Sequence, residues 1–160
     1  MISDLQIPDE STTEAKTTKR TGRKKKDRLS LIPLGGVGEI GKNCWVYEYN
    51  EDLLIVDCGL MFPDEDMLGV DIVIPETRFL VENRERLVGL VLTHGHEDHV
   101  GALPYFLKAL GENFPPIWGT RLTLGIAGGK LEEHGFDLGS LPLNVITPGT
   151  SFELGPFRID

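Results

Sequence analysis

The sequence predicts an α/β fold that begins near Leu29, because strand-like and helix-like patterns alternate from that residue onward. An apolar run at 87–92 has the composition of a buried strand, and an amphipathic helix pattern follows it at 100–110. Between the two lies Thr93-His94-Gly95-His96-Glu97-Asp98-His99, a loop that carries three of the four histidines. This order of strand, polar loop and helix predicts a functional site at the end of a buried strand.

Residues 1–28 differ from the rest of the chain in charge. They contain eight Lys or Arg and five Asp or Glu, a net charge of +3 out of a total of −9, which leaves −12 for the remainder. Because they include few large apolar residues, we predict a disordered basic tail. Its run of Arg23, Lys24, Lys25 and Lys26 could make non-specific contacts with nucleic-acid phosphates, although a solvated tail without a binding role fits equally well.

The composition is that of an ordinary globular domain, with 40% hydrophobic and 26% charged residues. No apolar run is long enough to span a membrane, and the N-terminus lacks the apolar core of a signal peptide. The only cysteines, Cys44 and Cys58, form no C-x-x-C pair, so we expect them to be small buried residues. These features predict a cytoplasmic protein that does not contact membranes.

The folded part is expected to open with a strand at 29–34 that runs into a glycine-rich loop. Residues 36–41, Gly-Val-Gly-Glu-Ile-Gly, match the dinucleotide-binding pattern G-x-G-x-x-G. That pattern requires a helix after the glycines, whereas 44–49 and 53–56 have the composition of two strands joined by a turn. We therefore reject a dinucleotide site and expect the loop, with Gly36, Gly38 and Glu39, to approach a ligand or the histidine-rich loop.

Asp57 follows the second strand of this hairpin and has two possible roles. It could cap the turn at Gly59, or it could orient the side chains of the histidine-rich loop from behind. We favour the second role, because the strand that ends at Asp57 should lie beside the strand that carries His94.

The remaining segments are expected to alternate between loops, helices and strands. The acidic segment 60–75 should be a long loop, because a calcium-binding loop that started at Asp64 would place Leu68 and a proline at ligand positions. Pro75-Glu76-Thr77 has the features of a helix start. The other expected elements are a short strand at 117–119, a helix at about 120–134 with His134 in its last turn, and strands at 143–146, 151–154 and 157–159.

The residue types of the histidine-rich loop suit divalent metal ions. Imidazole and carboxylate groups bind zinc or manganese, and His94 and His96 would point the same way from an extended backbone. Asp98 and His99 could then serve a second ion. The zincin pattern H-E-x-x-H is excluded, because one residue too few separates His96 from His99. A loop in which the histidines only cap and solvate is the alternative.

The T-H-x-H-x-D-H loop resembles the signature of the metallo-β-lactamase superfamily. Other stretches resemble the ribonuclease J family, in the β-CASP branch of that superfamily, and the likeness extends over about residues 29–160. It implies that these residues form the N-terminal portion of an αββα sandwich with a two-metal site at the edge of its sheets. The stretches are residues 34–43 (LGGVGEIGKN), 57–59 (DCG), 62–63 (FP), 69–71 (GVD), 73–75 (VIP) and 130–135 (KLEEHG).

The resemblance also implies roles for individual residues. His94 and His96 would hold one zinc ion and Asp98 and His99 the other, with manganese or magnesium as possible replacements. Asp98 and His99 would take part in catalysis, and Asp57 would support the loop. The remaining metal ligands and the β-CASP domain of the family are expected after Asp160, so the chain alone is expected to be incomplete and inactive.

The function implied by the resemblance is zinc-dependent hydrolysis of RNA. The family acts as a 5′-to-3′ exonuclease that prefers a 5′-monophosphate and also as an endonuclease, in RNA processing, including that of ribosomal RNA, and in RNA decay. A homo-oligomer is expected for the full-length protein. The alternatives are another hydrolase of the superfamily that acts on a small ester or thioester, and a non-catalytic RNA-binding module.

Overall fold

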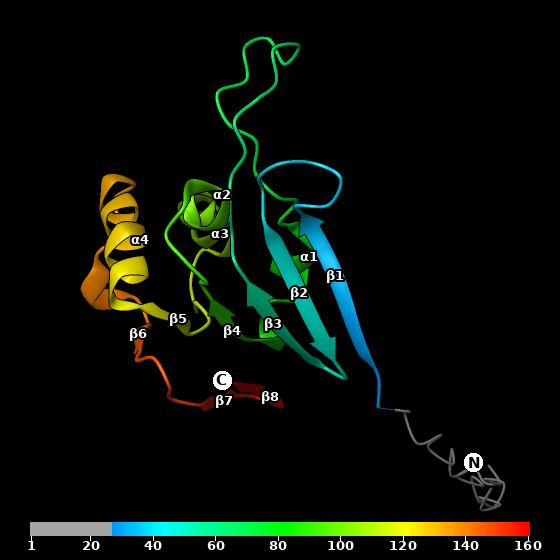
Figure 1. Ribbon diagram of the computed structural model, residues 1–160, viewed down its shortest axis with the longest axis vertical. Coiled ribbons are helices and arrows are strands. Elements are labelled where there is room, and N and C mark those ends of the chain that lie inside the picture. Colours follow the sequence, from blue (N-terminus) through cyan, green and yellow to red (C-terminus); the bar gives the residue numbers. More distant parts are fainter. Residues whose placement is uncertain (1–26) are drawn as a thin grey trace, which may run out of the picture.

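The computed structural model describes residues 27–160, and Figure 1 shows their arrangement. The predicted basic tail, with its run from Arg23 to Lys26, therefore lies outside the described residues except at its last two positions. Among residues 27–160, no helix has both the length and the apolar character needed to cross a membrane.

The centre of the fold is a six-stranded mixed sheet in which the strands follow chain order. The first strand pairs antiparallel with the second, and the second with the third, whereas the third to sixth strands are parallel to one another. The strands are β1 (Leu29–Gly35), β2 (Cys44–Tyr49), β3 (Asp52–Val56), β4 (Leu87–Val91), β5 (Ile117–Thr120) and β6 (Leu143–Ile146).

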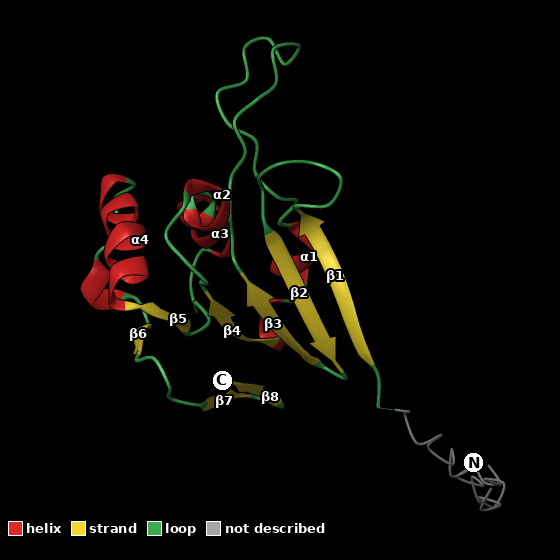
Figure 2. Cartoon of the chain, viewed as in Figure 1, coloured by secondary structure: helices red, strands yellow, loops and turns green. Residues whose placement is uncertain are grey.

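Helices pack against one face of this sheet, with which they share a hydrophobic core; Figure 2 draws them in red and the strands in yellow. They are α1 (Arg78–Glu82), α2 (Glu97–Val100), α3 (Leu103–Leu110) and α4 (Arg121–Glu133), with short 3-10 helices η1 (Arg84–Arg86) and η2 (Leu138–Ser140). The predicted α/β class is confirmed.

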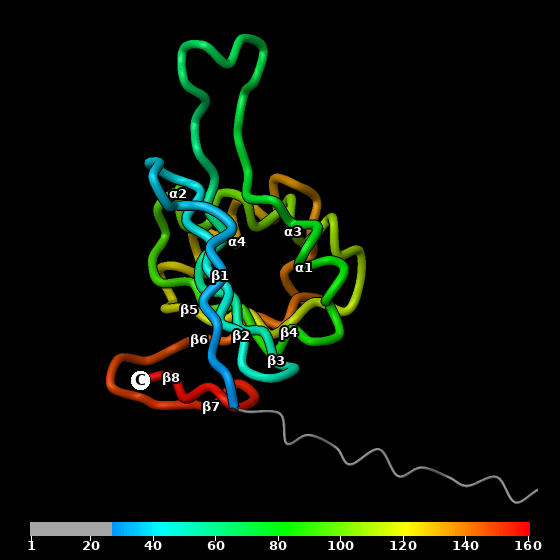
Figure 3. The backbone as a smooth tube through the Cα atoms, turned by 90° about the vertical axis from the view of Figure 1, so that its right-hand side faces the viewer, coloured from blue at the N-terminus to red at the C-terminus, as the bar shows by residue number. Residues whose placement is uncertain are grey.

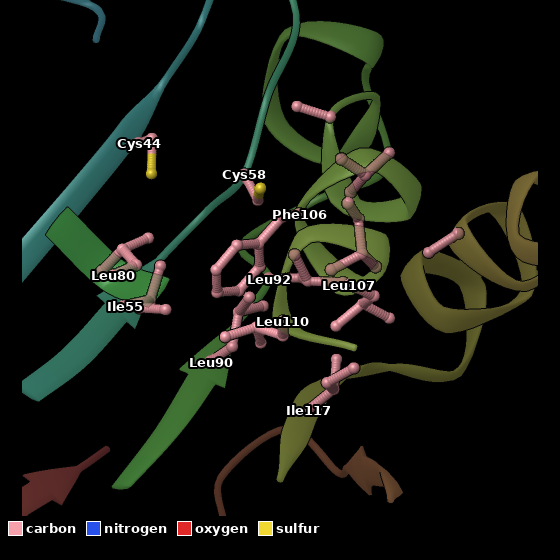
Figure 4. Packing of buried hydrophobic residues seen from close by; sticks show 14 of the residues in the cluster. Cys44, Ile55, Cys58, Leu80, Leu90, Leu92, Phe106, Leu107, Leu110 and Ile117 are labelled. Carbon is pink, nitrogen blue, oxygen red and sulfur yellow. The ribbon is translucent and has the colours of Figure 1, made fainter. Parts of the chain in front are cut away.

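The hydrophobic core lies between the sheet and the helices, and Figure 4 shows its centre. Phe106 of α3 is fully buried among residues from several strands, including Ile55, Leu90 and Ile117. On the other face of the sheet, the hairpin of β7 (Phe152–Leu154) and β8 (Phe157–Ile159) packs against Trp118, whose ring stacks on that of Phe152 with centroids 4.3 Å apart. The sheet is therefore covered by helices on one side and partly by a hairpin on the other.

The helix predicted at 100–110 is present as α3 from Leu103, whereas Val100 ends the separate turn α2, which begins at Glu97 within the predicted loop. Tertiary hydrogen bonds explain the break between them. In a continuous helix, the Ala102 amide would donate to the Asp98 carbonyl. Instead it donates to the carbonyl of Cys58 (2.9 Å), and the Asp98 carbonyl accepts from the amide of Asn43 (2.9 Å). Pro104 has no amide hydrogen to continue the pattern. Contacts with distant loops therefore outweigh the local helical pattern here.

Two other expectations concern the connections. The acidic segment is a long loop as predicted, and it projects from the body of the molecule in Figure 3. Its two arms meet at one bridge between Met61 and Val73. The helix expected from Pro75 begins three residues later, at Arg78, and is only five residues long. The helix predicted at 120–134 is present as α4, with the hydroxyl of Thr120 accepting a hydrogen bond from the Thr123 amide at its start.

Candidate metal and catalytic site

The histidine-rich loop lies at one edge of the sheet, where the parallel strands β3 and β4 both end. Val56 pairs with Val91, and the Asp57 amide donates to the Val91 carbonyl (2.9 Å). Because the carboxyl ends of parallel strands meet at the same edge, Asp57 lies directly beside the start of the loop. The predicted adjacency of these two strands is confirmed.

Asp57 connects the two ends of the histidine-rich loop. Its side chain is buried, and Oδ1 accepts hydrogen bonds from the Thr93 amide (2.8 Å) and hydroxyl (3.0 Å). Oδ2 lies 2.8 Å from the Thr93 hydroxyl and 2.8 Å from Nδ1 of His99. The amide of Gly59, which Asp57 could have capped, donates to the Asn43 carbonyl instead (2.9 Å). The contacts of Asp57 therefore favour the supporting position over the cap.

These contacts also assign protons on two histidines. A carboxylate can only accept, so Nδ1 of His99 and the Thr93 hydroxyl both donate hydrogen bonds to Asp57. The Thr93 oxygen then accepts from Nδ1 of His94, which lies 3.0 Å away. A neutral imidazole whose proton is on Nδ1 has an unprotonated Nε2, the form in which imidazole binds a metal ion.

Asp98 and His99 present one pair of donor atoms at a suitable separation. Oδ2 of Asp98 lies 3.4 Å from Nε2 of His99. A tetrahedral zinc ion with bonds of about 2.0–2.1 Å separates its ligand atoms by about 3.3–3.4 Å. The Asp98 carboxylate is 40% exposed, which leaves it open to an ion from solvent. This pair fits a divalent ion in both chemistry and spacing.

His94 and His96 lie close to this pair without closing around a common point. The ring centroids of His94 and His99 are 3.9 Å apart, and those of His94 and His96 are 4.7 Å apart. Throughout residues 27–160, no three His, Cys, Asp or Glu side chains converge tightly enough to form a complete metal site. The structure thus gathers all four predicted ligands at one edge but aligns only Asp98 and His99 as a pair.

Helix α4 holds the loop from the side. A side chain at Gly95 would meet Cδ1 of Ile126 at 2.5 Å, so the loop packs directly on the helix there. Glu97 forms an ion pair with Lys130, one helical turn further along α4. These two contacts restrict the backbone that carries the histidines.

The glycine-rich loop reaches the site only in part. A Cβ at Gly36, whose φ is +80°, would lie 2.6 Å from Oδ1 of Asn43, so this glycine permits close approach to a neighbour of the histidine-rich loop. Gly38 faces open space. Glu39 accepts from the Gly36 amide (3.2 Å) and pairs with Lys42 (3.0 Å), and the hydrogen bond from Lys42 lowers the pKa of its carboxyl group. Of the three predicted loop residues, only Gly36 lies against the site.

Asn43 belongs to the site and was missed by the sequence analysis. Its Nδ2 lies 3.0 Å from Oδ2 of Asp98 and 3.2 Å from Nε2 of His99, the same two atoms that fit a metal ion. Its backbone is bonded to Asp98 and Gly59. The only signal in the sequence was a polar residue between a glycine-rich loop and a buried strand, which does not reveal a partner 55 residues away.

Replacing Asn43 by aspartate is expected to destabilise the metal-free protein and to strengthen zinc binding. Without metal, the new carboxylate would repel that of Asp98, whereas with zinc it would add an anionic oxygen ligand. A gain of about 1.4 kcal/mol corresponds to tenfold tighter binding. Zinc affinity by chelator competition and melting temperature with and without zinc measure both effects. Asn113→Asp, in the exposed loop after α3, is the control; equal behaviour of the two variants would contradict the assignment of Asn43.

The two cysteines and His134 lie outside the group of side chains that could bind metal. Cys44 and Cys58 are both buried with free thiols, as expected. A hydrogen bond to the Cys44 sulfur, together with burial, raises the pKa of the Cys58 thiol, which keeps it protonated and unsuited to bind metal. His134 lies at the end of α4, where Nδ1 donates to the Lys130 carbonyl (2.9 Å) and the ring packs on Tyr105.

Comparison with protein families and with known proteins gives a consistent result. A family model described as the metallo-beta-lactamase superfamily matches residues 37–146. Ribonuclease J of Thermus thermophilus is 47% identical over 133 residues, which are 82% of this chain and 23% of that protein. Ribonuclease J of Synechocystis is 46% identical over 127 residues, 79% of this chain and 19% of that protein. The chain thus spans about a fifth of the length of these relatives.

Among solved structures, one similar fold is that of a diphosphatase from the PhnP family. It has a TM-score of 0.48 and 17% sequence identity, and the match covers 79% of this chain and 54% of that one.

Proposed function

Since this chain belongs to the metallo-β-lactamase superfamily, we propose that its histidine-rich loop binds divalent metal ions and serves in the hydrolysis of RNA phosphodiester bonds. The observation that carries the proposal is the pair formed by Oδ2 of Asp98 and Nε2 of His99, 3.4 Å apart and fixed from behind by Asp57. The choice of RNA is supported by 47% identity to a protein named ribonuclease J.

In this proposal His94 and His96 bind one zinc ion, and Asp98 and His99 bind the other, with manganese or magnesium as possible replacements. Bound divalent ions supply Lewis-acid stabilisation of the phosphate oxygens and lower the pKa of water. Asp57 holds the proton on Nδ1 of His99 directly and on Nδ1 of His94 through Thr93, so that both rings present Nε2. The Asp98 carboxylate is partly exposed and would be accessible to substrate.

The finer parts of the proposal follow from the family resemblance. They are 5′-to-3′ exonuclease action on RNA with a 5′-monophosphate, endonuclease activity, and a cytoplasmic role in RNA processing and decay as a homo-oligomer. Arg23 to Lys26 would add contacts with RNA phosphates. Two metal ions need more donors than the four side chains of the histidine-rich loop. We therefore propose activity for this segment within a protein of the length of its relatives.

A chimera tests the function. We expect Thermus thermophilus ribonuclease J, with its matched segment replaced by this chain, to cleave 5′-monophosphorylated RNA only in the presence of a divalent metal. Loss of a residue that supports a metal ligand typically lowers activity about 10- to 100-fold. His99→Ala should lower the rate of RNA cleavage further, because it removes a ligand itself. His134→Ala, at the end of α4 and outside the donor set, is the matched control.

Three outcomes would contradict the proposal. One is a folded chimera that leaves RNA intact, and a second is equal loss of activity in the His99→Ala and His134→Ala variants. The third is hydrolysis of a thioester in preference to RNA, which would favour a small-molecule hydrolase of the same superfamily.

A further inference from the structure

A cavity of about 400 Å³ opens beside Asp98, next to the proposed metal-binding pair. One wall is formed by Ile40 and Gly41, from the loop between β1 and β2. A second wall is formed by Met61 and Phe62, from the start of the projecting acidic loop, and a Cβ at Gly41 would lie 3.1 Å from Cβ of Met61. The cavity therefore lies between two loops that are remote in sequence and adjoins a residue of the site.

The two walls are anchored at their base. The Lys42 amide donates to the Leu60 carbonyl (3.0 Å), which joins one loop to the other. The Leu60 amide donates to the carbonyl of Glu97 (3.0 Å), which joins both loops to α2. Met61 and Val73 close the acidic loop just above. These main-chain bonds fix the spacing of the walls without help from the side chains that line them.

The side chains on the rim are apolar and exposed. Phe62 is 67% exposed and Ile40 is 93% exposed, and neither residue belongs to the hydrophobic core. Burial in the fold does not account for two large apolar residues that line the same cavity. An exposed aromatic ring beside a phosphate-processing site is suited to stacking on a flat apolar group.

The charge around the cavity limits what it can accept. Asp64, Glu97 and Asp98 all contribute to its lining, and of these Glu97 is paired with Lys130. Carboxylates repel phosphate, so the part of a nucleotide that enters this cavity must be uncharged. A nucleobase is flat, largely apolar and neutral, and it stacks on aromatic rings whatever its identity.

We propose that this cavity is a subsite for one nucleobase of the RNA, which stacks on Phe62 and contacts Ile40 while its phosphate lies at the histidine-rich loop. The inference rests on the proposed function and adds to it a contact with the base. Phe62 would then secure the nucleotide next to the reacting phosphate without selecting a particular sequence.

The test compares two small ligands that differ only in the base. The ¹⁵N-labelled chain is titrated with adenosine 5′-monophosphate and with ribose 5-phosphate in the presence of zinc, and amide shifts are followed by NMR. We expect the adenine compound to bind at least about tenfold more tightly, because stacking is lost in the other. Its additional shifts should fall on Ile40, Gly41, Met61 and Phe62.

Two variants make the result specific to the cavity. Phe62→Ala should remove the difference between the two ligands, whereas Leu68→Ala, on the same loop and 90% exposed, should leave it unchanged. Equal binding of the two ligands, or no binding of either, would overturn the inference. The inference would also be overturned if Phe62→Ala and Leu68→Ala changed the difference in affinity between the two ligands equally. Because RNA cleavage by the chimera is measured separately, failure of the subsite is distinguishable from failure of the proposed function.

Discussion

Replacing Gly59 by alanine is expected to prevent the chain from reaching a stable folded state. A Cβ atom at this position would lie 1.6 Å from the carbonyl oxygen of Asp98 and 2.6 Å from the amide nitrogen of His99. Both are main-chain atoms, so no side-chain rotation can relieve the overlap. The loss of stability should exceed the about 1–3 kcal/mol of ordinary overpacking, because the segment after β3 must move away from α2.

Urea unfolding followed by circular dichroism measures this loss. Gly129→Ala is the matched control, because Gly129 lies within α4 and a Cβ there would meet nothing within 4 Å. Alanine at that position should raise stability by about 0.5–1 kcal/mol, since glycine is a poorer helix former. A Gly59→Ala variant that unfolds at the same urea concentration as the unaltered chain would show that the two segments are not in contact.

The Asp57→Asn variant is expected to bind zinc about 10- to 100-fold more weakly, the usual effect of removing a residue that orients a metal ligand. Asparagine is compatible with the positive φ of 62° at this position, so the backbone should be preserved. Its amide group, however, places a donor where the carboxylate accepted from Thr93 or His99. One hydrogen bond is therefore replaced by two opposed donors. The protons of both histidine rings are then no longer held on Nδ1.

The affinity is measured by competition with a chromophoric zinc chelator, and stability by melting in excess chelator. The buried, unsatisfied donor should also cost about 1–3 kcal/mol of stability. Asp66→Asn, on the exposed acidic loop, removes the same charge without these contacts and should change neither quantity. If Asp57→Asn binds zinc as tightly as Asp66→Asn does, Asp57 does not orient the ligands.

Local patterns in the sequence were sufficient to predict most of the helices and strands. The hairpin of β2 and β3, the apolar strand β4 and the long helix α4 each follow from composition, periodicity and end signals within a few adjacent residues. Thr120 at the start of α4 and Gly135 after its end are such signals. The clustering of histidines likewise identified the loop at which the predicted ligands gather.

What the sequence did not reveal depends on contacts between distant residues. The periodicity of 100–110 is that of one helix, and it contains no trace of the bonds from Cys58 and Asn43 that divide it. The place of Asn43 beside Asp98 and His99 depends on the pairing of strands that bring residues 43, 57 and 98 together. Such contacts follow from the tertiary fold and not from the identity of any single residue.

The anchoring of α2 has a consequence for how the site can open. Three consecutive carbonyl groups of this helix, those of Glu97, Asp98 and His99, accept from the amides of Leu60, Asn43 and Cys58. A single helical turn has almost no stability of its own, so its order depends on these bonds to the segments that flank β2 and β3. The turn that carries Asp98 and His99 therefore cannot fray independently, and its opening is coupled to unfolding of the sheet edge. Metal ions bound as proposed would therefore enter and leave across a backbone that remains closed.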